Sequence, residues 1–157
     1  MLAPVGSVDY VSQAVSLFRS GQYLEAVSAY RHAAVDQPQN ADLAVQAAFA
    51  LIGAGKLDEA AGAAQQGLSQ LPPEQWAGVA KQAGELFPSQ AAYDQAALAA
   101  ARASDKALAD PGTRFATGLI AFGRGEMTRA ASDFDAVLKA APQDAITKKL
   151  RELTGVR

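Results

Sequence analysis

The segment Gly21–Val27, which reads GQYLEAV, decides the fold of this chain because related segments follow it twice. Gly55–Ala61 reads GKLDEAA and lies 34 residues further on, and Gly125–Ala131 reads GEMTRAA and lies another 70 residues on. The same displacements separate Pro38, Pro72 and Pro142. A period near 34 predicts stacked helix pairs, and the wider second gap leaves room for one further unit.

The residue types explain how each unit is built. About a quarter of the chain is alanine, the strongest helix former, and half of the chain is apolar, which is enough for one continuous core. Gly21, Gly55 and Gly125 are expected to end a first helix, because glycine takes a left-handed backbone without steric cost. Each proline of the series then blocks continuation of a second helix. The sequence therefore predicts helical hairpins.

One series of positions is diagnostic: Tyr10, Ala14, Leu17, Gly21, Tyr23, Ala26, Tyr30, Ala33 and Pro38. This series closely resembles the consensus of the tetratricopeptide repeat (TPR) family. The resemblance implies an all-α fold, an α-solenoid of antiparallel helix pairs. In that family such a solenoid usually binds another polypeptide and catalyses nothing.

We expect residues 1–157 to form a single TPR-like domain with three clear repeats, one degenerate repeat and a C-terminal capping helix. The degenerate repeat is the third, because Pro88 interrupts its helical pattern. The capping helix is amphipathic, with Ile146, Leu150 and Leu153 on one face. In chain order the expected units are about 7–40, 41–74, 75–110 and 111–144, with the cap at 143–154.

The resemblance also places a binding groove, since the first helix of each TPR pair lines the concave face. Nine apolar residues map to groove positions and are the expected partner-binding site: Val11, Val15, Phe18, Val45, Phe49, Ile52, Phe115, Leu119 and Phe122. A second apolar stripe faces the partner helix, so these helices are apolar on two sides. Family members that clamp a chaperone's carboxylate tail carry lysine and asparagine in the groove, and this chain has valine and phenylalanine instead.

Residues for chemistry are scarce, and we expect no catalytic residue, cofactor or metal. The only histidine, His32, is predicted to be a solvated surface residue, and the only tryptophan, Trp76, a core residue. Neighbouring carboxylates such as Asp58 and Glu59 diverge on a helix instead of sharing a site. The chain has no cysteine, which excludes thiolate chemistry.

The expected partner is a protein or peptide with an apolar or amphipathic segment. The alternative is a homo-oligomeric scaffold, in which the same groove takes another copy or the chain's own Leu2, Pro4 and Val5. A net charge of −2 disfavours nucleic acid, and no stretch is apolar enough to insert into a membrane. We expect a soluble protein, in the cytoplasm rather than the periplasm because no signal peptide is present.

Overall fold

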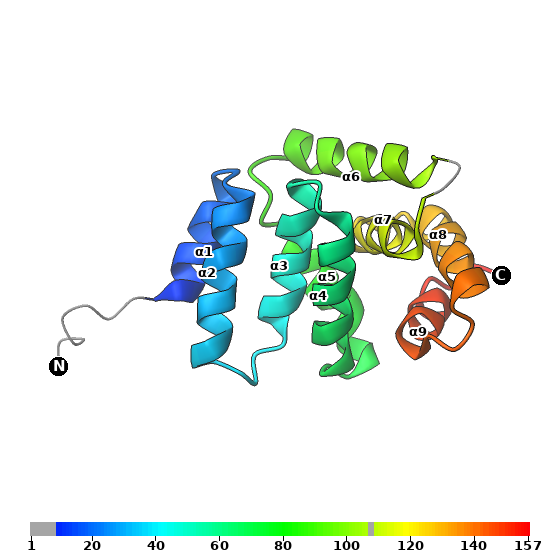
Figure 1. Cartoon of the computed structure of the whole chain (residues 1–157), viewed down its shortest axis with the longest axis horizontal. Helices are drawn as coiled ribbons and strands as arrows, with labels where there is room; N and C mark the ends of the chain where they lie inside the picture. The colour runs from blue at the N-terminus through cyan, green and yellow to red at the C-terminus, as the bar shows by residue number, and fades with distance from the viewer. Residues whose placement is uncertain (1–8, 107–108) are drawn as a thin grey trace.

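The computed structural model describes residues 9–106 and 109–157, and these residues form helices joined by short turns, without a strand (Figure 1). The predicted all-helical fold class is confirmed. The helices are α1 (Tyr10–Arg19), α2 (Tyr23–Asp36), α3 (Asp42–Gly53), α4 (Leu57–Ser69), α5 (Trp76–Gly84), α6 (Gln90–Ser104), α7 (Pro111–Gly123), α8 (Met127–Ala140) and α9 (Ala145–Leu153). A short 3-10 turn, Pro73–Gln75, precedes α5.

The three glycines of the repeated segments end helices as predicted. Gly21, Gly55 and Gly125 have φ angles of 80°, 78° and 79°, the left-handed region that only glycine enters without strain. They follow α1, α3 and α7, and each lets the chain reverse into the next helix. The resulting hairpins are α1 with α2, α3 with α4, and α7 with α8.

The segment between the second and third hairpins folds differently from a repeat. Residues 75–110 do hold two helices, α5 and α6, near the expected positions. These two pack mainly on α3 and α7 instead of on each other, while α4 packs directly on α7. The physical reason is that α6 buries only Ala96, Ala100 and Ser104, which offer too little apolar area to fix a close partner helix.

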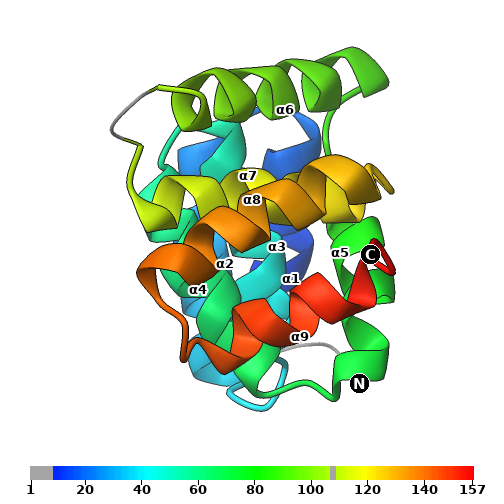
Figure 2. The ribbon, with the colours of Figure 1, turned by 90° about the vertical axis from the view of Figure 1, so that its right-hand side faces the viewer.

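Two crossed arrays of helices result from this arrangement. Helices α1 to α4 run side by side in Figure 1. Helices α6, α7, α8 and α9 run across them in Figure 2, in the order α6, α7, α8, α9 from top to bottom. Helix α9 covers α8 as the predicted cap and also touches α4, where the side-chain amide of Gln65 donates a 2.9 Å hydrogen bond to Asp144.

Helix α7 lies where the arrays cross and contacts α3, α4, α5, α6 and α8. All eight residues of Phe115–Phe122 are buried, so the helix has no solvent-facing side over two turns. Glycine allows the closest approaches. Gly118 lies against the Phe134 ring of α8, and Gly123 lies against the Phe49 ring of α3.

Replacing Gly118 by alanine tests this packing. The added methyl group would lie 2.7 Å from the Phe134 ring, so we expect a loss of about 1–3 kcal/mol in the free energy of unfolding, the cost of overpacking a core. Gly62 is the matched control, because it also lies inside a helix but has open space around its Cα. Gly62→Ala should add about 0.5–1 kcal/mol, since alanine favours the helix. Denaturant unfolding measures both, and an unchanged Gly118→Ala protein would contradict the packing.

Candidate protein-binding surface

The structure divides the nine expected groove residues into two groups. Val11 and Val15 of α1 are partly exposed. The other seven are buried, each at 3 % exposure or less: Phe18, Val45, Phe49, Ile52, Phe115, Leu119 and Phe122. The expectation of an open apolar stripe along all three hairpins therefore needs correction, because most of the stripe is inside the core.

The chain's own residues cover the stripe. The Phe87 ring, in the loop between α5 and α6, lies edge-on to the Phe18 ring with centroids 5.0 Å apart. The Phe49 ring meets α7 at Gly123, where the carbonyl oxygen of Ala80 in α5 also approaches within 3.1 Å of the position of an added Cβ. Helices α5 and α7 thus occupy the space that a ligand would take in an open groove.

The sequence carried a signal for this arrangement without identifying the covering segment. First helices with two apolar sides must be covered by something, which the pattern showed. Trp76, Val79, Ala80 and Ala83 form the buried stripe of α5, and this stripe was predicted to be core. Its partner could not be known, since the period of 34 fails in this part of the chain and no other rule placed α5 against α3.

The open end of the stripe lies on α1. Val11 and Val15, with Ser12, Ser16, Arg19 and Ser20, line a shallow depression of about 540 Å³. Arg19 also borders a second depression that includes Phe87 and Pro88. The exposed face of α1 therefore continues toward the loop that covers Phe18, and it presents two valines in a polar frame.

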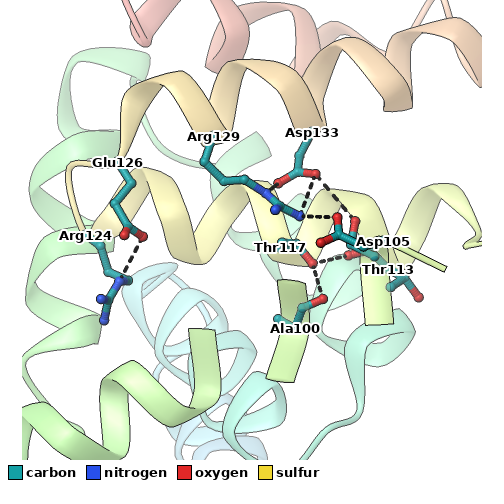
Figure 3. Close-up of polar contacts among 9 residues, drawn as sticks. Ala100, Asp105, Thr113, Thr117, Arg124, Glu126, Arg129 and Asp133 are labelled. Atoms are coloured by element: carbon teal, nitrogen blue, oxygen red, sulfur yellow. Dashed lines mark hydrogen bonds and ion pairs between the residues drawn. The ribbon is translucent and has the colours of Figure 1, made fainter. Parts of the chain in front are cut away.

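A polar network holds α6 to the α7–α8 hairpin (Figure 3). Nε of Arg129 donates to Asp133 at 2.8 Å, and its Nη2 reaches Asp105 at 3.1 Å. The Thr117 hydroxyl donates to the carbonyl oxygen of Ala100 at 3.0 Å. Burial raises the pKa of the Asp133 carboxyl, although the bond from Arg129 opposes that shift. The network is a structural tie, since every group in it faces a partner within the chain.

Arg124 makes a second tie between the same elements. Its guanidinium lies 2.8 Å from Asp94 in α6 and 2.9 Å from Glu126, and it stacks over the Tyr93 ring at 4.8 Å from the centroid. The first contact spans α6 and the end of α7. Sequence reasoning missed these ties because the residues involved are distant in the chain and show no shared pattern.

The residues considered for chemistry have structural surroundings. His32 is exposed and stacks on the Tyr10 ring, with centroids 4.8 Å apart. Trp76 is buried, and its indole N–H donates to the carbonyl oxygen of Leu71 at 2.9 Å. Both positions agree with the sequence-based predictions of a surface histidine and a core tryptophan.

One carboxylate pair that the sequence did not reveal joins the start of α4 to the start of α7. A hydrogen bond to Asp110 raises the pKa of Asp58, while the backbone N–H of Thr113 lowers the pKa of Asp110. Both side chains lie at the surface, where water screens them. Across residues 9–106 and 109–157, no group of three histidine or acidic side chains could hold a metal ion. No helix in these residues is long and apolar enough to cross a membrane.

Comparison with known families adds to this geometry. Residues 17–83, from the end of α1 to the end of α5, match the sequence profile of the tetratricopeptide repeat. The chain contains tetratricopeptide repeats. No curated protein sequence matches the chain significantly. TPRs are generally non-catalytic modules for protein–protein interaction, and the TPR profile covers the α1 face as well as the α5 helix that fills the groove beside it.

Stability measurements on two variants separate core from surface in this stripe. Phe49→Ala removes a fully buried ring, so we expect a loss of about 3–5 kcal/mol in the free energy of unfolding. Val15→Ala alters a partly exposed side chain of the same stripe and should cost less than about 1 kcal/mol. Denaturant unfolding of both proteins gives the comparison. Equal and small losses would mean that Phe49 lies on an open groove after all.

Proposed function

We propose that this TPR protein is a non-catalytic binding module that takes an apolar or amphipathic segment of a partner protein on the exposed face of α1. The observation that carries the proposal is the pair Val11 and Val15, the two members of the groove stripe that stay partly exposed. Isolated exposed apolar residues are ordinary. This pair is different because it continues a stripe that is otherwise covered.

The repeat itself indicates what covers such a stripe. Val11 and Val15 precede Val45 and Phe49 by one period of 34 residues, so the two pairs hold equivalent positions in successive repeats. Val45 and Phe49 are completely buried, and their helix α3 packs on α5. On α1 the last member of the stripe, Phe18, is covered by Phe87. A segment from another protein would complete the cover over the remaining two.

The chain's own α5 is a template for the segment that fits. It is a nine-residue helix with one apolar face, formed by Trp76, Val79, Ala80 and Ala83. A partner helix of that kind combines one large anchor with small residues that allow close approach. Recognition of an apolar helix face in a groove is a recurrent mode of protein binding. The expected partner segment is therefore a short amphipathic helix.

The size of the surface sets the expected affinity. Burying a valine side chain contributes roughly 1.5–3 kcal/mol, and an aromatic anchor on the partner adds a similar amount. Association costs several kcal/mol in lost freedom, which offsets much of this gain. Binding in the micromolar range that exchanges readily follows from these magnitudes. Salt should have little effect, since the contact is mainly apolar.

Self-association is the competing use of the same face. A homo-oligomer built through the whole groove is disfavoured, because Phe49 and its neighbours are already covered within the chain. Leu2, Pro4 and Val5, the other segment considered for the groove, lie outside the described residues. The exposed pair Val11 and Val15 remains available to a second copy, so the test must measure the mass of the protein in solution.

The test uses two matched substitutions of an exposed apolar residue by aspartate. Val15→Asp places a charge in the proposed contact, and Leu24→Asp places one on α2, where Leu24 is 52 % exposed. A partner captured by the wild-type protein should bind Val15→Asp at least tenfold more weakly, about 1.4 kcal/mol, and bind Leu24→Asp normally. Calorimetry with the purified partner gives the affinities.

Two results would contradict the proposal. Equal binding by Val15→Asp and wild type would remove α1 from the contact. A wild-type dimer that Val15→Asp converts to a monomer, measured by light scattering, would show that this face serves self-association instead. Circular dichroism of each variant confirms that its helices remain folded.

A further inference from the structure

The exposed face of α8 holds a depression that the groove does not explain. It is about 780 Å³ in volume and lies between the beginning of α7, the outer side of α8 and the end of the chain. The charged residues that line it are Arg114, Asp135, Lys139, Arg151 and Arg157. Thr128 and Ser132 add hydroxyl groups along α8, so the surface is polar and basic.

Four of these five charges are positive, and the single carboxylate is already paired. Asp135 accepts a 2.8 Å bond from Nε of Arg151. Nη1 of Arg151 in turn donates to the carbonyl oxygen of Val156 at 2.6 Å, which holds the last residues against α9. Arg114, Lys139 and Arg157 form no ion pair among the described residues. The depression therefore has excess positive charge that the chain does not neutralise.

Helix dipoles account for only part of this charge. Lys139 and Arg151 lie in the last turns of α8 and α9, where a positive side chain stabilises the helix end. Arg114 lies near the start of α7, where the dipole disfavours a positive charge. Its charge favours the ionised form of Asp133, but that carboxylate already has Arg129 as its ion-pair partner. Arg157 belongs to no helix.

The distribution of charge along the chain points to a local binding surface. Residues 1–100 contain four basic and nine acidic residues, and residues 101–157 contain ten basic and seven acidic residues. The overall charge of −2 therefore conceals a basic end. The acidic remainder repels an extended polyanion such as a membrane surface or a nucleic acid. A short acidic segment contacts the basic end alone.

We propose that this basic depression on α8 is a docking site for an acidic polypeptide segment, separate from the apolar face of α1. Carboxylates of the segment pair with Arg114 and Lys139, and the hydroxyls of Thr128 and Ser132 bond to its backbone. Arg151 stays paired with Asp135 and supports the site. Arginine suits this role because its planar guanidinium binds a carboxylate through two bonds.

The test measures the binding of a fluorescent ten-residue peptide of alternating glutamate and serine to the whole chain. Affinity from fluorescence anisotropy should fall at least tenfold in the double variant Arg114→Gln/Lys139→Gln. The matched control is Lys56→Gln/Lys81→Gln, which removes two exposed positive charges elsewhere and should bind normally. Affinity should also fall from low to physiological salt, because ions screen exposed charges.

Several outcomes would overturn the site. These are no binding at low salt, an equal loss in both double variants, or equal binding of a peptide with glutamine in place of glutamate. Tighter binding of single-stranded DNA or of anionic lipid vesicles, lost in the Arg114→Gln/Lys139→Gln protein, would assign the surface to a different partner. Neither double variant touches a buried apolar residue, so a folding defect does not obscure the comparison.

Discussion

Burial of α7 on every side is the constraint on which the rest of the structure depends. A helix with eight successive buried residues needs neighbours all around it, and the chain supplies them from both arrays. Close approach at Gly118 and Gly123 brings α8 and α3 against it. Because apolar burial is the main favourable term in folding, this crossing contributes a large share of the stability. The other helices are positioned by how they reach α7.

The insertion of α5 and α6 changes what the repeat can bind. In a plain stack of hairpins the first helices would present a continuous concave groove. Here α5 and Phe87 occupy that groove, so the recognition surface shrinks to the exposed stripe of α1. The fold keeps the interaction chemistry of the repeat but uses most of it within the chain. Internal use of a groove makes binding selective, because only one short face remains for a partner.

The sequence predicted the hairpins well because their signals are local. Gly21, Gly55 and Gly125 end helices at the expected places, and small residues meet where the helices cross. The arrangement of 75–110 was not predictable in the same way. Alanine-rich helices give weak periodic signals, and the contacts of Trp76 and Phe87 join segments that are far apart in the chain. The candidate site changed for this reason, since a groove pattern identifies apolar positions without saying what covers them.

Amide hydrogen exchange of the intact protein tests the central claim, that α7 is the buried core of two crossed arrays. Exchange in the most buried elements follows global unfolding, whereas exposed helices open locally. The account predicts the slowest exchange in residues 115–122 and clearly faster exchange in residues 90–104 of α6, which bury little. Exchange in 115–122 as fast as in 90–104 would show that α7 is not enclosed, and the crossed arrangement would then be incorrect.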